Sequence, residues 1–225
     1  DFDFLFAEPE TPVEQRVDLP KSLVSLTNKV PSVTAQIALR YLSKRGITRD
    51  DILKWKIGYC SGGEYAGRVV VPSFNENGYA NYFIARSYGG AWPRYKNPPA
   101  SRDIIFNELY VNWDEDIVIV EGVFDAIKAG NAIPLLGSTL RENSALFQAI
   151  VKNGRRVFLA LDEDASKKAR SIARLLLKYG VEVHEVDTSG IEDVGDMSKN
   201  EFQSRKNNAA IVQKDNYLLQ RLFAV

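Results

Sequence analysis

The sequence predicts an α/β protein in which a parallel sheet flanked by helices follows a smaller region of mixed α+β structure. Two patterns support this class. From residue 117 onward, short apolar runs rich in β-branched residues alternate with stretches of helical period, as in successive strand–helix–strand units. Upstream, two apolar runs within residues 67–85 flank an Asn-Gly pair, which is typical of an antiparallel hairpin.

The first half of the chain is expected to contain one helix before the hairpin. This helix covers residues 31–44, because Val33, Ile37 and Tyr41 fall on one helical face, with Ala38 and Leu42 beside them. A basic residue followed by glycine, Arg45-Gly46, is a typical helix end.

The hairpin is expected to have strands at residues 67–72 and 79–85. They are joined by Asn75-Glu76-Asn77-Gly78, in which the Asn-Gly pair supplies the positive φ angles that a tight turn needs. Residues 86–102 are rich in glycine and proline and carry basic and aromatic side chains, so they are expected to form a loop. Within it, Trp92 is expected either to pack on the hairpin or to offer its ring for stacking on a ligand.

The second half contains the repeated strand and helix patterns. Strands are expected at 117–120, 133–136, 157–161 and 181–186, and helices at 124–129, 142–152, 165–179 and from 198 onward. These patterns divide the chain into a linker or tail (1–20), a basic subdomain (21–112), the sheet domain (113–200) and a short C-terminal helical segment (201–225).

Composition excludes several classes of protein. Hydrophobic content is 45% and no apolar run approaches ~18 residues, so neither a membrane span nor a membrane partner is expected. One cysteine and one histidine exclude an internal disulfide and a Cys-based zinc site, which fits a cytoplasmic protein. Residues 31–110 carry 11 Lys and Arg against 6 Asp and Glu, whereas residues 111–200 carry 11 against 15. This asymmetry fits polyanion binding beside a metal cluster, or it is chance.

Acidic residues follow three of the predicted strands. Glu121 ends the first strand, Asp162 and Asp164 follow the third, and Asp193 and Asp196 lie after the fourth. Ligands bind at the carboxyl edge of open parallel sheets, and carboxylate oxygens are the ligands that Mg²⁺ prefers. The acids therefore predict a magnesium site at this edge. Two alternatives stay open: Asp164 caps the helix expected from residue 165, and the acids after the fourth strand are ordinary loop residues.

Three motifs resemble the Toprim domain, which primases, type IA and II topoisomerases and some nucleases share. They are Glu121-Gly122-Val123-Phe124-Asp125, Leu136-Gly137-Ser138-Thr139-Leu140 and Asp162-Glu163-Asp164. The upstream sequence is similar to the start of a bacterial-type primase core in segments 41–47, 57–59, 67–72, 84–86, 93–98 and 106–110. The motifs follow the family's order over residues 38–200.

The resemblance implies the RNA-polymerase core of a bacterial or phage-type DNA primase, which makes short RNA primers on single-stranded DNA from ribonucleoside triphosphates. It implies three catalytic acids, Glu121, Asp162 and Asp164. Mg²⁺ or Mn²⁺ would be bound by Glu121, Asp162, Asp164, Asp193 and Asp196. The positions that would contact nucleotide or template are Arg45, Arg68, Arg86, Arg94, Tyr95, Asn97 and Asp125. Arginine suits phosphate, and a tyrosine ring suits base stacking.

The chain departs from the family pattern in several places. The N-terminal zinc module of primases is absent from this sequence, and Asn107 stands where bacterial relatives often have a lysine. A replicative helicase is a further partner that the family implies. The compact motifs suggest a phage enzyme, which would act in the host cytoplasm. His184 is expected to be structural, and no side chain is assigned as a general base.

Two other functions use the same residues differently. A Toprim nuclease or topoisomerase fragment would use the acids for strand cleavage. A non-catalytic nucleic-acid-binding protein on a primase scaffold would bind DNA without incorporating nucleotides.

Overall fold

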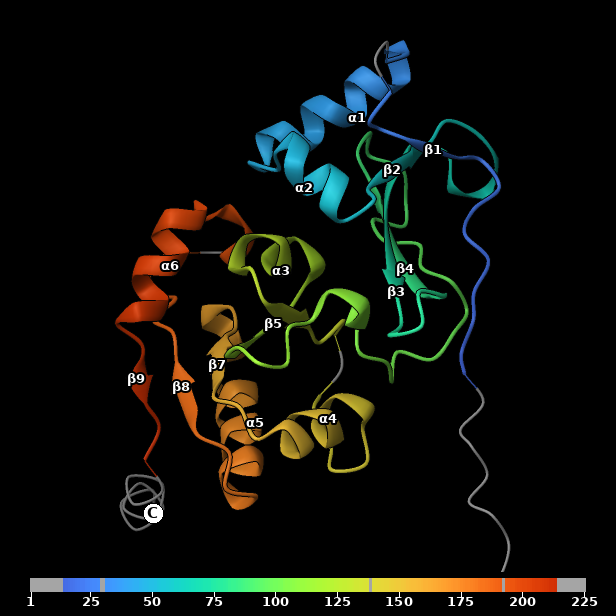
Figure 1. Ribbon diagram of the computed structural model, residues 1–225. Coiled ribbons are helices and arrows are strands. Elements are labelled where there is room, and N and C mark those ends of the chain that lie inside the picture. The colour runs from blue at the N-terminus through green and yellow to red at the C-terminus, as the bar shows by residue number, and fades with distance from the viewer. Residues whose placement is uncertain (1–13, 29–30, 138, 192, 214–225) are drawn as a thin grey trace, which may run out of the picture.

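A computed structural model describes residues 14–28, 31–137, 139–191 and 193–213 of the chain (Figure 1). The first sheet has four antiparallel strands in the order β1 to β4: Leu23–Ser25, Gly58–Cys60, Arg68–Phe74 and Ala80–Ser87. Helices α1 (Val33–Lys44) and α2 (Arg49–Lys54) lie between its first two strands in sequence. The predicted hairpin is thus confirmed as β3 and β4.

The second sheet has the strand order β6-β5-β7-β8-β9. Four of its strands are parallel: β6 (Ala132–Pro134), β5 (Ile117–Val120), β7 (Val157–Ala160) and β8 (Val183–Glu185). The last, β9 (Ala210–Ile211), runs antiparallel to β8 at the edge. The helices are α3 (Val123–Ala129), α4 (Ala145–Asn153), α5 (Ser166–Lys178) and α6 (Lys199–Asn207). The predicted α/β class is confirmed.

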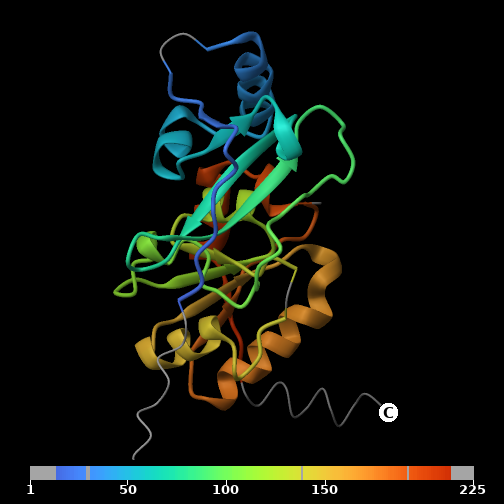
Figure 2. The ribbon, with the colours of Figure 1, turned by 90° about the vertical axis from the view of Figure 1, so that its right-hand side faces the viewer.

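Alternating side chains of β5 place helices on both faces of this sheet. Val118 and Val120 face a core shared with α3, α1 and the antiparallel sheet, whereas Ile117 and Ile119 face a core shared with α4 and α5. Figures 1 and 2 show α3 between the parallel sheet and the helices α1 and α2, with α4 and α5 on the far face. One continuous core therefore joins the two sheets, and the predicted domain limits stay a prediction.

Helix α1 is confirmed, and the predicted apolar side is confirmed in part. Ala38 and Leu42 are buried and Tyr41 packs against the core, whereas Val33 is 74% exposed and Ile37 is 46% exposed. The buried face is therefore rotated from Val33 and Ile37 toward Ala35, Ala38 and Leu42.

The hairpin turn also differs in one detail. Gly78 has a φ of +82°, but Asn77 is not in the left-handed region. The side chain of Asn75 instead closes the turn, because its Oδ1 accepts from the amides of Asn77 (3.1 Å) and Tyr79 (2.9 Å).

The ends of the described chain are more ordered than the sequence predicts. The amide of Val17 donates to Ala80 O (2.8 Å) and Gln15 Nε2 donates to Asn81 O (2.8 Å), so this segment is tied to the start of β4. The C-terminal prediction of helix is wrong at β9, where pairing with β8 overrides local preference. Residues 1–13 and 214–225 of the predicted tails lie outside the described residues. No helix in the described ranges is long and apolar enough to cross a membrane.

Candidate active site

A cavity of about 360 Å³ lies at the carboxyl edge of the parallel sheet. Its other wall comes from the end of α1, from β4 and from the loop after β4. Four acids from the strand ends line one part of it: Glu121, Asp125, Asp162 and Asp193. Four other polar side chains of the predicted basic region line the rest: Arg45, Tyr95, Asn97 and Arg102. The fold therefore brings together acidic and basic groups that the sequence separates by up to 148 residues.

Glu121 follows β5 directly and lies half-buried at the cavity wall. Burial raises the pKa of Glu121. The carboxylates of Asp162, Asp164 and Asp193 raise it further, against the opposite effect of Lys168. Glu121 Oε1 is buried without a hydrogen-bond partner, and Oε2 lies 3.9 Å from Lys168 Nζ on α5. One carboxylate oxygen of Glu121 is thus left without a protein donor. No signal in the sequence pointed to its neighbour Lys168.

Asp125 and Asp193 form a carboxyl pair behind this wall. Asp125, in the first turn of α3, is 5% exposed, and its Oδ2 accepts from the amide of Gly122 (2.7 Å). Burial and the facing carboxyl of Asp193 raise the pKa of Asp125. A Cβ on Gly195 would lie 2.9 Å from Oδ1 of both acids, so only glycine fits against the pair without a shift. The two carboxyl groups therefore lie against the same glycine, and Asp193 favours the protonated form of Asp125.

Asp162 joins the end of β7 to the loop that carries Asp193. Its Oδ1 accepts from the amide of Val194 (3.3 Å), and burial raises the pKa of Asp162. Asp164 is exposed and does not line the cavity. The alternative that it caps α5 is wrong, because Ala165 is the N-cap and no side chain caps that helix. Asp196 is also exposed and outside the cavity.

The acids suit a hard divalent cation by their chemistry. They supply carboxylate oxygens, one of them buried and unpaired, and their mutual effects on pKa show concentrated negative charge. Within the described residues, however, no three carboxylate, imidazole or thiol groups converge closely enough to form a ready metal centre. The assignment of Glu121, Asp162, Asp164, Asp193 and Asp196 as metal ligands therefore stays a prediction.

The basic part of the cavity is built on aromatic packing. The guanidinium of Arg45, at the end of α1, lies 5.0 Å from the ring centre of Phe124 and 5.6 Å from that of Tyr41. Asn97 accepts a hydrogen bond from Ala85 N (3.3 Å) and is thereby tied to β4. Arg102 was not predicted as a site residue. Its Nη1 is 3.4 Å from Leu136 O. The one sequence signal for Arg102 was its position in the basic loop of residues 86–102.

Three predicted arginines lie outside the cavity. Arg68 is 4% exposed and donates to Ala66 O (3.1 Å) and Pro93 O (2.8 Å). Arg86 is also buried and donates to the hydroxyl of Tyr95. Both support the loop after β4 instead of facing the cavity, whereas Arg94 is exposed on that loop.

The only histidine of the chain is far from this chemistry. His184 lies on β8, its ring stacks on Phe158 at 4.8 Å, and its Nε2 is 2.7 Å from Glu182 Oε1. These contacts agree with the predicted structural role.

The chain is similar to known DNA primases. A DNA primase of Thermotoga maritima is 27% identical over 188 residues, which are 74% of this chain and 33% of the relative. The chain thus spans about a third of that protein's length. No protein-family model matches the chain.

Solved structures agree with this likeness. The DnaG primase catalytic domain bound to ssDNA has a TM-score of 0.68 at 19% identity, covering 80% of this chain and 74% of that chain. The zinc-binding and RNA polymerase domains of the Aquifex aeolicus primase give 0.66 at 22% identity, covering 78% and 56%. The chain therefore has the fold of the catalytic core of DnaG-type DNA primases.

Proposed function

We propose that this chain is the RNA-polymerase core of a DNA primase, which synthesises short RNA primers on single-stranded DNA from ribonucleoside triphosphates. The cavity carries the proposal, because it joins the acids of the sheet edge to Arg45, Tyr95 and Arg102. Phosphate transfer needs negative ligands for metal ions beside positive groups for phosphate, and this cavity holds both. The similar catalytic domain was solved with single-stranded DNA bound.

Each side chain has a distinct proposed task. Glu121 and Asp162 would hold Mg²⁺ or Mn²⁺, with Asp164, Asp193 and Asp196 as further candidates. When bound, the metal ions supply charge neutralisation and activation of the attacking hydroxyl. Arg45 and Arg102 bind and orient phosphates, and Tyr95 offers a ring to a base. Asp125 holds a proton against Asp193 and positions it.

The proposed setting follows the family. A replicative helicase is a proposed partner, without a contact surface assigned to it. The proposed location is the cytoplasm, or the host cytoplasm if a phage encodes the chain.

The decisive experiment is primer synthesis by the purified chain. The chain is incubated with single-stranded DNA, labelled ribonucleotides and either Mg²⁺ or Mn²⁺, with and without EDTA. Template-dependent, EDTA-sensitive short RNA is the expected product. DNA cleavage in place of synthesis would favour the nuclease hypothesis, and DNA binding with neither reaction, even from an annealed primer, would favour the non-catalytic one.

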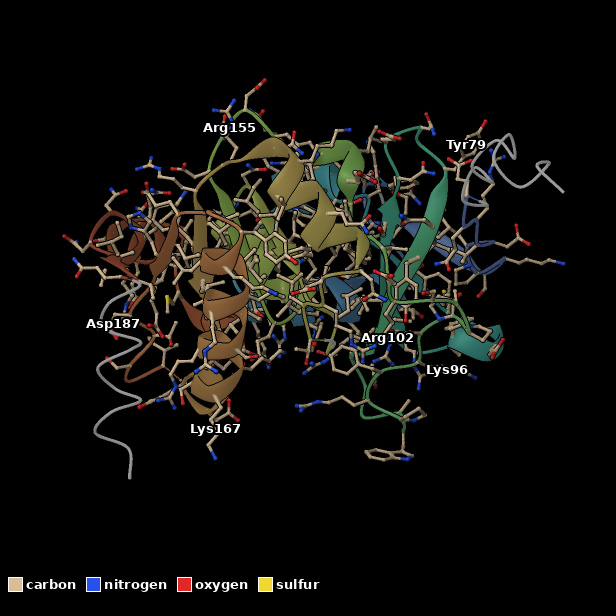
Figure 3. The ribbon with its side chains drawn as sticks, turned by 90° about the horizontal axis from the view of Figure 1, so that it is seen from below. Tyr79, Lys96, Arg102, Arg155, Lys167 and Asp187 are labelled. Atoms are coloured by element: carbon tan, nitrogen blue, oxygen red, sulfur yellow. The ribbon has the colours of Figure 1, made fainter. Side chains whose placement is uncertain are left out.

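Replacing Arg102 with alanine is expected to weaken DNA or nucleotide binding. Because one cation at the cavity is lost, the slope of log affinity against log salt should fall by about 0.7 for single strands. The matched control is Arg155→Ala, which removes an exposed arginine at an edge of the molecule apart from Arg102 (Figure 3). Fluorescence anisotropy with a labelled oligonucleotide at several salt concentrations measures both. If the two variants had equal slopes of log affinity against log salt, Arg102 would not contact the bound nucleic acid.

A further inference from the structure

Trp92 differs from the other two tryptophans of the chain. It is 89% exposed, whereas Trp55 is 6% exposed and Trp113 packs against the core. The alternative that Trp92 packs on the hairpin is therefore wrong. Single exposed apolar residues are common and carry little meaning alone. What distinguishes Trp92 is how its loop is anchored and what lies beside it.

The loop of residues 88–94, here called the Trp92 loop, is fixed at both ends to the antiparallel sheet. The amide of Ser87 donates to Arg94 O (2.9 Å), and the amide of Tyr88 donates to Gly67 O (3.1 Å). The buried guanidinium of Arg68 donates to the carbonyl of Pro93, the residue next to Trp92. The ends of the loop are thus tied to the sheet, and the Trp92 side chain lies in solvent beside a fixed backbone.

The Trp92 loop leads directly into the cavity. Tyr95 forms a bridge with Arg86 of β4, and its ring lines the cavity wall. Figures 2 and 3 show the loop after β4 extending to the same side of the molecule as α5. A nucleic-acid strand that enters the cavity from this side would pass the Trp92 loop.

The charges of this loop favour a polyanion. Arg94 is exposed, and its guanidinium has no ion-pair partner among the residues that the structure describes. Lys96, by contrast, forms an ion pair, with its Nζ 3.1 Å from Glu64 Oε1, and its ammonium group lies over the ring of Tyr65. An exposed indole two residues from an available guanidinium matches the combination of stacking ring and cation that binds single-stranded nucleic acid.

We propose that Trp92 stacks on an unpaired base of the template strand outside the cavity, while Arg94 binds a phosphate beside it. The inference rests on the proposed function, since it specifies how the same site takes its template. Single-stranded DNA is the partner favoured, because bases in a duplex are stacked on each other and offer no free face. Trp92 is a positioning residue in this proposal and not a catalytic one.

The test uses the full chain and an unstructured dT oligonucleotide, with Trp92→Ala, Trp92→Phe and Arg94→Ala. Trp92→Ala should weaken binding about 5- to 150-fold, the range for loss of one stacked base, with the salt slope unchanged. Trp92→Phe should keep most of the affinity, and Arg94→Ala should lower the salt slope. The control is Tyr110→Ala, because Tyr110 is another exposed aromatic residue and does not line the cavity.

Tryptophan fluorescence gives a readout that does not depend on activity. The oligonucleotide should quench the wild-type emission and shield it from acrylamide, and Trp92→Phe should lose this change because the two remaining tryptophans are at least partly buried. In primer synthesis, Trp92→Ala should raise the KM for template and leave kcat unchanged.

The outcomes separate the two proposals. If the wild type binds the oligonucleotide but Trp92→Ala binds equally well, or the emission is unaffected, the role of Trp92 is refuted and the proposed function stands. If the wild type binds no single-stranded DNA, both fall together. A duplex that quenches Trp92 as strongly as the single strand would also overturn the stacking proposal.

Discussion

Replacing Asp162 with asparagine should abolish primer synthesis while the affinity for single-stranded DNA stays the same or rises slightly. Loss of residues that only support a metal ligand typically costs 10–100-fold, so loss of the ligand itself should cost at least about 100-fold. Asparagine keeps the shape of the side chain and an oxygen for the amide of Val194, so the loop should remain in place. The rate of RNA synthesis at saturating template measures the effect.

Glu163→Gln is the matched control for this variant. Glu163 neighbours Asp162 and carries the same charge, but it is exposed and does not line the cavity. It should synthesise primers at close to the wild-type rate. Loss of DNA affinity in Asp162→Asn with unchanged turnover would refute the assignment of Asp162 as a metal ligand.

Replacing Asp125 with asparagine should stabilise the protein at neutral pH in the absence of divalent cations. The buried Asp125 carboxyl faces Asp193, and its pKa is raised in the folded state. At neutral pH this carboxyl is ionised in the unfolded chain, so folding must either bury its charge or take up a proton. Both lower the free energy of unfolding. Asparagine mimics the protonated carboxyl, because its amide group can donate to Asp193 while its oxygen accepts from Gly122 N. The gain in free energy of unfolding should be on the order of 1–3 kcal/mol.

The effect should depend on pH in one direction. Because the folded-state pKa of Asp125 lies above the unfolded value, its protonated form favours folding fully below about pH 4. That contribution is lost as the pH rises through neutrality toward the folded-state pKa. Thermal unfolding of both proteins in EDTA between pH 4 and pH 8 should therefore show curves that meet at acid pH and separate as the pH rises. Parallel curves would mean that Asp125 is already ionised in the fold.

Much of the architecture could be predicted from the sequence. The apolar runs at 117–120 and 157–160 are long enough only for strands and are buried on both faces, so they specify the centre of a parallel sheet. Their ends place Glu121 and Asp162 at one edge, because carboxyl ends of parallel strands lie together. The two acids that line the cavity beside β5 and β7 could therefore be identified from strand pattern and chain direction alone.

Short elements escaped prediction. Strands β1 and β2 have three residues each and helix α2 has six, too short for a clear period. Their formation depends on neighbours in the antiparallel sheet and on a capping box at Thr48 and Asp51.

The sequence by itself determined the fold class and which strand ends carry acids, because local periodicity and chain direction fix both. The tertiary structure decided which of the basic residues line the cavity with those acids. Arg68 and Arg86 are buried as supports, Arg102 lines the cavity, and Trp92 is held in solvent. An arginine in a sequence shows only its charge, whereas its role depends on which carbonyls, rings and carboxylates distant segments bring to it. Those surroundings form only when the two sheets pack around one core.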